Sequence, residues 1–421
     1  MKIKETDKPY FEVCKLEAEP HKMPIKQKAF WRGLIKCLSK GEMKAVSFSY
    51  KETGMERLGK DEPALILMNH SSFTDLQIVG TVFSDRQYHI VCTNDGFVGK
   101  NNLMRKIGCI PAKKFINDPV LVKDMKYCFD KLGSSVVMYP EASYSFDGTQ
   151  TPLPKSMVKC IRMMKVPVVM VRTTGAFMRD PLYNNLQKRN VKVSADIKYL
   201  LSKEDIEKKS LSEIEEILEK EFSYNHFKEQ FESNIIVNED FRADGLHRVL
   251  YKCPACGQEG KMFGKGIVIG CKNCNKEYEL LENGKIHALD ERTEFEFVPD
   301  WYAWERAEVR KEIEQGKYLL DTDVNIKMLV DLKSIYSVGE GHLRHTKDGF
   351  ELKGCDGQLE YTQSGKASYS LYSDYFWYEI GDMISIGNNS AQYYCFPKDQ
   401  EHAIVAKARL ATEEIYKSLT Q

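Results

Sequence analysis

The sequence predicts an α/β domain with a mixed sheet, then a small cysteine-rich hairpin unit, then an antiparallel β domain closed by a C-terminal helix. Short apolar runs alternate with helical patterns in the first half of the chain, which is typical of α/β domains. Two Cys-x-x-Cys pairs follow, with fourteen residues between them. Beyond about residue 290, strand-like runs are separated by turn signals such as Asp348-Gly349. We expect four segments: residues 1–44, 45–235, 245–290 and 291–421.

Size and charge limit the functions that the chain can have. Its 421 residues carry 61 basic and 61 acidic side chains, so the formal net charge is zero. That balance disfavours a dedicated nucleic-acid-binding protein. No apolar run reaches the roughly 20 residues needed to span a bilayer, and the N-terminus does not look like a signal peptide. Eight of the twelve cysteines are scattered singly, which indicates a reducing, cytoplasmic compartment.

Residues 22–44 combine a basic flank with an apolar helical stripe. The basic residues are Lys22, Lys26, Lys28, Arg32, Lys36, Lys40 and Lys44, and the stripe is Phe30, Trp31, Leu34, Ile35 and Leu38. This pattern is typical of a helix lying on an anionic membrane surface. It is equally typical of an amphipathic helix packed on its own domain. The first alternative predicts a peripheral protein at the inner membrane face, and both stay open.

The α/β segment contains several recognisable elements. Strands are expected at residues 46–50, 64–68, 89–93, 136–139, 166–171 and 191–199. The clearest helix covers residues 118–132, with Asp118 as its cap, Pro119 in its first turn and Gly133 at its end. A charged amphipathic helix over residues 211–232 closes the segment. Active groups in such sheets gather at the carboxyl ends of strands.

One such strand end carries the stretch Asn69-His70-Ser71-Ser72-Phe73-Thr74-Asp75. A carboxylate at Asp75 can accept a hydrogen bond from one nitrogen of His70, which leaves the other nitrogen free to take a proton. This is the base and orienting acid of a catalytic triad without its nucleophile, so the attacking hydroxyl would belong to a substrate. The alternative is a helix capping box with Ser72 as the N-cap and Asp75 three residues on.

Three further motifs follow in order: residues 108–114 (GCIPAKK), 136–145 (VVMYPEASYS) and 166–171 (VPVVMV). Together with the first stretch they resemble the four blocks of the glycerolipid acyltransferase family, the lysophosphatidic acid acyltransferases and their relatives, over roughly residues 45–200. The resemblance implies that His70 is the general base and that Asp75 orients it. It also implies an acyl-CoA or acyl carrier protein thioester as donor, and a lysophospholipid or lipid alcohol hydroxyl as acceptor.

The sequence departs from the family pattern where the acceptor phosphate is bound. The family's third block reads Glu-Gly-Thr-Arg-Ser, whereas here Tyr144 replaces the arginine. The arginine that usually ends the second block is Lys114. Lysine keeps the charge but loses the bidentate fork of arginine. The substrate-binding residues that the resemblance implies are Lys113, Lys114, Glu141, Ser143, Tyr144 and Ser145. We expect His70 to face an open groove that Glu141 borders.

The two Cys-x-x-Cys pairs predict a zinc ribbon. The expected ligands are Cys253, Cys256, Cys271 and Cys274. Four thiolates leave no open coordination position, so the zinc would be structural. The glycine-rich residues 260–270 supply a hairpin between the pairs.

The C-terminal segment reads as a β domain. A helix containing Trp301, Trp304 and Val309 precedes expected strands at residues 318–332, 350–354, 366–372, 375–380 and 391–396. An amphipathic helix over residues 403–417 ends the chain. A bent antiparallel sheet closed by one helix is pleckstrin-homology-like, an assignment by fold analogy alone.

Two functions remain in competition. The first is an O-acyltransferase at the membrane surface, with His70 as base. The second is a catalytically weak or inactive lipid-binding adaptor, in which the zinc ribbon or the C-terminal domain recruits a protein partner. Nucleic-acid binding by the ribbon is less well supported, because no basic-aromatic groove accompanies it.

Overall fold

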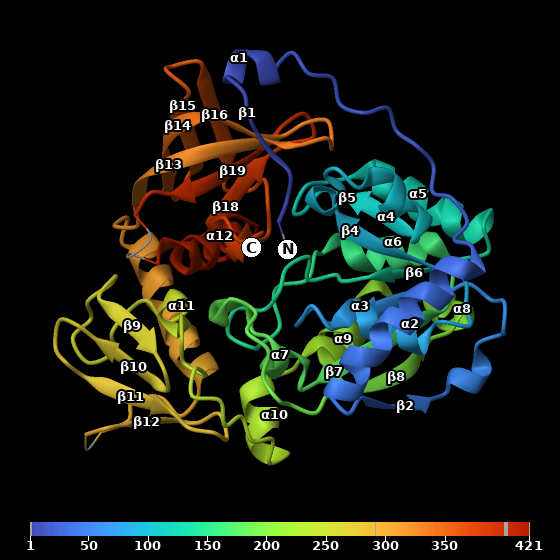
Figure 1. The fold of residues 1–421 in the computed structure, drawn as a ribbon, viewed down its shortest axis with the longest axis horizontal. Helices are drawn as coiled ribbons and strands as arrows, with labels where there is room; N and C mark the ends of the chain where they lie inside the picture. Colours follow the sequence, from blue (N-terminus) through green and yellow to red (C-terminus); the bar gives the residue numbers. More distant parts are fainter. Residues whose placement is uncertain (1, 291, 400–402, 421) are drawn as a thin grey trace.

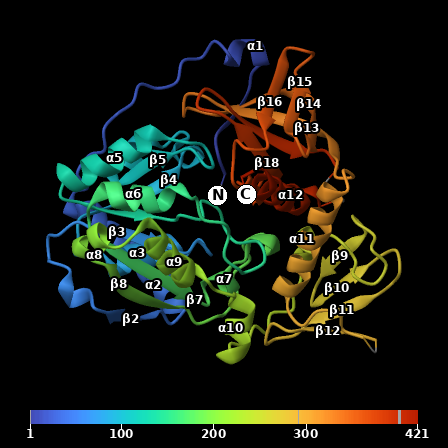
Figure 2. The same cartoon turned by 180° about the vertical axis from the view of Figure 1, so that it is seen from behind.

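The structure is a computed structural model that describes residues 2–290, 292–399 and 403–420. It contains a seven-stranded, a four-stranded and an eight-stranded sheet. Figure 1 shows the helix α12 (Ile404–Thr420) near the centre of the molecule, with the seven-stranded sheet on one side and the four- and eight-stranded sheets on the other. The view from behind in Figure 2 shows the same grouping.

The seven-stranded sheet is mixed, as predicted. Its strands are β2 (Ser49–Thr53), β3 (Leu65–Met68), β4 (Tyr88–Thr93), β5 (Cys109–Ala112), β6 (Ser135–Met138), β7 (Val168–Thr174) and β8 (Ser194–Leu201). Their order is β2-β8-β7-β3-β6-β4-β5. Neighbouring strands are parallel except β7 and β8, which are antiparallel. Strand β3, which leads to His70, is therefore central, and its side chains are buried on both faces.

Alternate residues of the central strands enter two different cores, as the two-residue period of a strand requires. Leu65, Leu67 and Met170 pack with α5 (Pro119–Asp130), α6 (Ser156–Met164) and α9 (Leu211–Phe222). Ile66, Met68 and Val171 pack on the other face with α3 (Asp75–Val82) and Met43 of α2 (Ala29–Ala45). Both faces of the sheet are thus covered by helices. The cap of α5 is the predicted one, since the Asp118 carboxylate accepts from the amides of Val120 and Leu121.

The helix expected over residues 211–232 is wrong as a single element. The chain instead forms α9 and α10 (His226–Glu232), with Ser223, Tyr224 and Asn225 between them. The side chain of Asn225 accepts from the Lys228 amide at 3.0 Å, which makes it the N-cap of α10. An asparagine side chain that accepts from an amide in the first turn of a helix stabilises a new helix start. It therefore favours two helices at this point over one continuous helix.

The four-stranded antiparallel sheet is the cysteine-rich unit. It consists of β9 (Met262–Lys265), β10 (Val268–Cys271), β11 (Glu277–Leu280) and β12 (Ile286–Ala288), in the order β12-β11-β10-β9. The predicted hairpin is the β9–β10 pair. The sheet packs on α11 (Val298–Glu314), where Trp301 is fully buried and donates from Nε1 to the Lys252 carbonyl at 2.9 Å.

The eight-stranded sheet is antiparallel along its main path, β16-β15-β14-β13-β19-β18-β17. Its strands are β13 (Leu320–Leu329), β14 (Ile335–Thr346), β15 (Gly349–Gly354), β16 (Leu359–Ser364), β17 (Tyr372–Trp377), β18 (Gly381–Gly387) and β19 (Gln392–Pro397). The strand expected at 366–372 is wrong, because residues 366–371 form a turn in which the Ala367 amide donates to the Ser364 carbonyl. The strand expected at 375–380 begins and ends three residues earlier, as β17.

The first residues of the chain belong to this C-terminal sheet, which the sequence did not predict. Strand β1 (Glu5–Asp7) pairs in parallel with β14, and α1 (Tyr10–Val13) follows. The chain then crosses to the α/β part and enters α2 (Figure 1). None of the described helices is both long enough and apolar enough to cross a membrane.

Candidate active site

The turn over residues 69–74, between β3 and α3, carries His70, and we call it the elbow. Buried polar contacts hold it in place on both sides. Asn69 is fully buried, and its Oδ1 accepts from the Thr173 amide of β7 at 2.8 Å. The His70 amide donates to Glu141 Oε2 at 3.1 Å, which connects the elbow to the loop after β6. The strand-to-helix turn therefore does not depend on its own residues alone.

The predicted pairing of imidazole and carboxylate is present in the structure. His70 Nδ1 lies 2.9 Å from Asp75 Oδ2. The same oxygen accepts from the amides of Ser71 at 3.1 Å and Ser72 at 3.3 Å, so it is an acceptor and Nδ1 carries the proton. That tautomer leaves Nε2 with a lone pair. The alternative capping box is present only in part. Asp75 Oδ2 accepts from the Ser72 amide, but Ser72 Oγ accepts from the Thr74 amide at 2.9 Å instead of from the Asp75 amide, and Thr74 is the N-cap of α3.

Burial sets the charge of this pair. Burial, helped by the nearby Lys114 ammonium, holds the pKa of His70 well below its usual value. Burial also raises the pKa of Asp75 to about 7, although the amides of Ser71 and Ser72 oppose the shift. At and above neutral pH the imidazole is therefore neutral, which is the form that can accept a proton.

Aromatic rings stack on the His70 imidazole. Tyr139 stacks on His70 with ring centroids 4.3 Å apart, and Tyr144 stacks on the opposite face at 4.0 Å. Phe73 in turn stacks on Tyr144 at 5.4 Å and is 45% exposed. The His70 side chain keeps only 16% of its accessible surface. The rings cover the two faces of the imidazole, and Nε2 lies at its edge, where it forms no hydrogen bond to any residue that the structure describes.

Glu141 lies behind the elbow, and both of its oxygens are engaged by protein donors. Oε1 accepts from the Thr151 amide at 2.8 Å and from the Tyr224 hydroxyl at 2.7 Å, while Oε2 accepts from His70. Burial raises its pKa to about 7. Ala142, the next residue, has φ +55°. In this left-handed conformation the backbone strain is smaller for glycine than for alanine. Glu141 therefore holds the loop after β6 in place through these contacts.

The other residues of this motif contact the C-terminal helix or their own turn. Arg409 of α12 donates from Nη1 to Ser143 Oγ at 3.3 Å and to the Tyr144 carbonyl at 3.1 Å. Ser145 Oγ donates to the Thr149 carbonyl at 2.6 Å. The C-terminal domain therefore contacts the loop that covers His70.

The two lysines after β5 also face the C-terminal domain. Lys113 Nζ donates to the Asn389 carbonyl at 2.6 Å. Lys114 Nζ lies 4.1 Å from the ring centre of Tyr372, whose hydroxyl donates to the buried Asp95. Burial lowers the pKa of Lys114, and the carboxylates of Asp95 and Asp374 oppose the shift.

Several residues at the site were not found from the sequence. Tyr139 directly precedes Pro140-Glu141 and could have been found from its position in the motif. Tyr224 and His226 lie at the break between α9 and α10, for which Asn225 was the available signal. Arg409 follows Ser143 by 266 positions in sequence, and no local pattern indicates such a contact.

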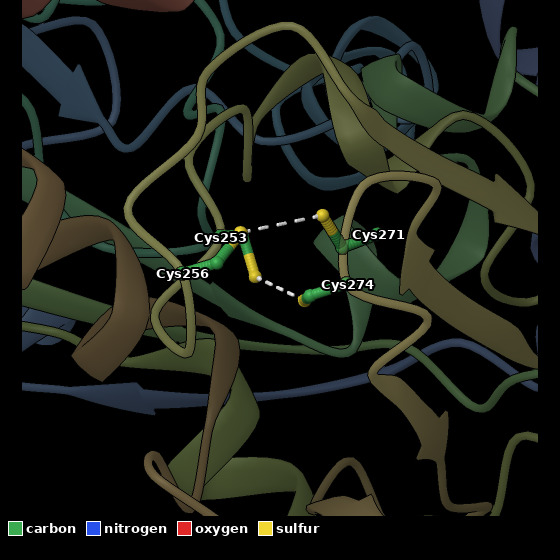
Figure 3. Close-up of side chains that lie close together, drawn as sticks. All are labelled: Cys253, Cys256, Cys271 and Cys274. Atoms are coloured by element: carbon green, nitrogen blue, oxygen red, sulfur yellow. Dashed lines mark hydrogen bonds between the residues drawn. The ribbon is translucent and has the colours of Figure 1, made fainter.

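The four expected metal ligands converge, as Figure 3 shows. Their sulfur atoms all lie within 4.8 Å of one another. The Cys253–Cys274 and Cys256–Cys271 sulfur pairs are 3.6 and 3.8 Å apart. Disulfides would require about 2.05 Å, whereas four thiolates about 2.3 Å from one zinc have sulfur–sulfur edges of about 3.8 Å. The cluster therefore fits a tetrahedral metal ion and could hold zinc.

Comparison with known proteins identifies the class of the α/β part. Residues 49–174 match the family model described as Acyltransferase, so this segment is an acyltransferase-family domain. No curated protein matches the chain. Among solved structures, the crystal structure of the 1-acyl-sn-glycerophosphate (LPA) acyltransferase PlsC from Thermotoga maritima is similar. The two share 16% identity over 46% of this chain and 81% of that chain, with a TM-score of 0.34. A likeness at this level does not extend to individual residues.

Proposed function

We propose that the protein is an O-acyltransferase that transfers a fatty acyl group from an acyl thioester to the hydroxyl of a lysophospholipid or a related lipid alcohol. The observation that carries the proposal is the 2.9 Å contact between His70 Nδ1 and Asp75 Oδ2 within a domain of the acyltransferase family. The donor would be acyl-CoA or acyl carrier protein, which present the same reacting thioester.

His70 acts as the general base in this proposal. Its Nε2 takes the proton of the acceptor hydroxyl while that oxygen attacks the thioester carbonyl. Collapse of the tetrahedral intermediate breaks the carbon–sulfur bond, and the imidazolium returns the proton to the leaving thiolate. Asp75 holds the ring by Nδ1 and stabilises its charged form. Zinc is not required, and the cysteine cluster would serve stability instead.

The membrane surface is the proposed place of action. Phe30 and Leu38 of α2 are 68% and 73% exposed, and basic residues flank them on the same helix. Ile35 and Met43 face inward instead, so α2 both packs on its domain and presents apolar side chains. This arrangement supports a cytoplasmic protein bound peripherally to the inner membrane face.

A non-enzymatic adaptor is the second candidate, because the rings of Tyr139 and Tyr144 enclose His70. In that function the C-terminal domain would bind lipid or a protein partner, and the ribbon could recruit one. The strand order and the closing helix α12 support the pleckstrin-homology-like assignment, which we keep as a proposal.

Release of free thiol from acyl-CoA, measured with a panel of lysolipids and anionic vesicles, distinguishes the two functions. We expect acceptor-dependent release by the wild type and a loss of about 100-fold or more in His70→Ala, as for removal of a general base. His342→Ala is the matched control, because His342 forms an exposed pair with Asp323 at 3.0 Å on the C-terminal sheet. Vesicle binding without thiol release would favour the adaptor, and equal release by His70→Ala would refute the role of His70.

A further inference from the structure

We propose that His226 is a positioning residue that holds the Ser71–Asp75 turn and thereby the orientation of His70. The inference rests on the proposed function for its kinetic consequence, but its structural consequence can be measured without turnover. His226 lies at the start of α10, outside the segment that matches the acyltransferase family.

A chain of hydrogen bonds connects His226 to the elbow. His226 Nε2 lies 3.0 Å from Ser71 Oγ, and Ser71 Oγ also accepts from Asn69 Nδ2 at 2.9 Å. Since Asn69 already supplies a donor, the Ser71 hydroxyl proton is free to point at His226 Nε2. His226 would then carry its proton on Nδ1, which lies 3.4 Å from Glu229 Oε2. This last contact is electrostatic, since neither atom forms a hydrogen bond with a described residue.

The far end of the chain is charged and anchored. Glu229 forms an ion pair with Arg172 of β7. Burial tends to raise the pKa of Glu229, but His226 and Arg172 outweigh it and hold the pKa below its usual value. Glu229 is therefore a carboxylate, suited to accept from the Nδ1 proton of His226. The chain links α10, the elbow and β7.

His226 itself cannot meet a substrate in this structure. It is 2% exposed, and it lies between the rings of Tyr224 at 4.6 Å and Phe177 at 5.6 Å. Ser71 is 3% exposed. Although Ser71, His226 and Glu229 have the order of a serine triad, the buried hydroxyl has no access to an acyl group. The order therefore supports positioning rather than a second nucleophile.

The consequence for catalysis passes through the Ser71 backbone. Its amide donates to Asp75 Oδ2 at 3.1 Å, the oxygen that also holds His70 Nδ1. If the hydrogen bond between His226 and Ser71 is lost, the turn is held less firmly. The Ser71 amide then donates less well to Asp75, and the carboxylate loses a stabilising partner. The pKa of Asp75, already raised to about 7, then rises further. Asp75 therefore stays protonated up to a higher pH, and in that form it cannot accept from His70.

Other charged and titratable groups also act on Asp75, and the experiment must separate their effects. The groups that interact with the Asp75 carboxylate are His70, His226, Tyr139, Tyr144, Asp180 and Tyr224. His226 acts on the carboxylate in two ways, through Ser71 and by direct electrostatic interaction. A variant that keeps a hydrogen bond to Ser71 but has no titratable ring separates the two.

The test uses His226→Phe, which retains an aromatic ring but not its nitrogens, in the full-length chain. His226→Gln is the conservative variant, because its amide can still bond Ser71. The matched control is His89→Phe, which removes another buried histidine, one bonded to Ser134 Oγ at 2.7 Å and to the Ile25 carbonyl at 2.9 Å. His89→Phe removes comparable hydrogen bonds from the same sheet without touching the elbow.

Nitrogen-15 histidine NMR over pH 5–9 is the primary measurement, with the His70 signals assigned by their loss in His70→Gln. We expect His226→Phe to move the titration seen at the His70 nitrogens upward by about half a pH unit or more, and His226→Gln to restore most of it. His89→Phe should leave that titration unchanged. An unchanged His70 titration in folded His226→Phe overturns the inference.

Thiol-release kinetics give the second measurement. The acid limb of kcat in His226→Phe should move upward by the same amount, with KM within about threefold of wild type. A wild type without thiol release would refute the proposed function alone, because the NMR titration still decides the role of His226. A shifted NMR titration with an unshifted kinetic limb would overturn the kinetic part of the inference.

Discussion

Carboxyl groups buried at or beside the His70 site share one property. Burial raises the pKa of four of them to about 7, namely Asp75, Glu141, Asp180 and Asp374. Each keeps its proton several pH units above an exposed aspartate, whose pKa is about 3.9. The charge of the site therefore changes in the neutral range, where small changes in contacts change which form is present.

Asp180 allows this property to be tested apart from catalysis. It is 4% exposed, and it accepts from Ser72 Oγ at 2.5 Å. Its pKa is about 7 in the folded chain and about 3.9 when unfolded. At a pH between these two pKa values, the Asp180 carboxyl is protonated in the folded state and ionised in the unfolded state. The free energy of unfolding of the wild type therefore falls, as pH rises, relative to that of Asp180→Asn, by up to about 1.4 kcal/mol per pH unit.

The measurement is urea denaturation of both proteins at pH 5, 6, 7 and 8. We expect Asp180→Asn to gain stability relative to the wild type from pH 5 to 7 and the difference to level off above that. A difference independent of pH would show that Asp180 ionises normally in the folded chain.

At the residue scale, the sequence predicted what a short spacing determines. His70 and Asp75 are five positions apart around a strand end, so their contact is local. The covering rings of Tyr139 and Tyr144 depend on how the loop after β6 folds back, and Arg409 depends on the docking of another domain. The local motif gives the positions of the two tyrosines, but neither the stacking of their rings nor the Arg409 contact is encoded in a local pattern.

At the scale of elements, apolar runs predicted the buried strands of the α/β part within a few residues. Periodicity was less informative for the C-terminal sheet, where β14 and β16 carry several exposed polar residues. The helix break at Asn225 was missed because the flanking apolar pattern continues across it. That break places Tyr224 in contact with Glu141 and His226 in contact with Ser71, so the missed detail lies at the candidate site.

The packing of α2 on α3 gives an element-scale prediction. Gly80 on α3 lies so close to α2 that an added Cβ would be 2.4 Å from Ile35 Cγ2. Gly33 on α2 has no atom within 4 Å of the same position. In open space, Gly→Ala in a helix stabilises by about 1 kcal/mol, whereas overpacking costs about 1–3 kcal/mol.

We therefore expect Gly33→Ala to raise the free energy of unfolding and Gly80→Ala to lower it. Adding Ile35→Ala to Gly80→Ala should recover part of the loss, which a double-mutant cycle by chemical denaturation measures. Equal stabilisation by both glycine substitutions would mean that α2 does not lie on α3, and that its apolar stripe is free for the membrane.

At the scale of the whole molecule, the parts are interlocked in a way that sequence patterns do not predict. The N-terminal strand β1 belongs to the C-terminal sheet, while α12 reaches the loop over His70. Arg409 is 2% exposed, and it lies 3.4 Å from Glu413 on the same helix. Any movement of the loop that carries Tyr144 therefore affects its contacts with the last helix of the chain.

The cysteine cluster lies away from the site and connects to it through α11 and α12. Its sheet packs on α11 through Tyr278 and Trp301, whose rings are 5.1 Å apart, and α11 in turn pairs with α12 through Arg306 and Glu413 at 2.6 Å. A metal ion bound only by the folded chain stabilises it by about 4 kcal/mol when the ion is present at a thousand times its Kd.

We expect one zinc per chain by elemental analysis, and none in Cys253→Ser. Loss of zinc should lower the unfolding temperature and unfold the four-stranded sheet, which Trp301 fluorescence reports, because four thiolates cannot stay close together without the ion. Cys37→Ser is the matched control, since Cys37 is exposed and single. A metal-free wild type with an unchanged unfolding temperature and four freely reactive thiols would contradict a structural zinc site.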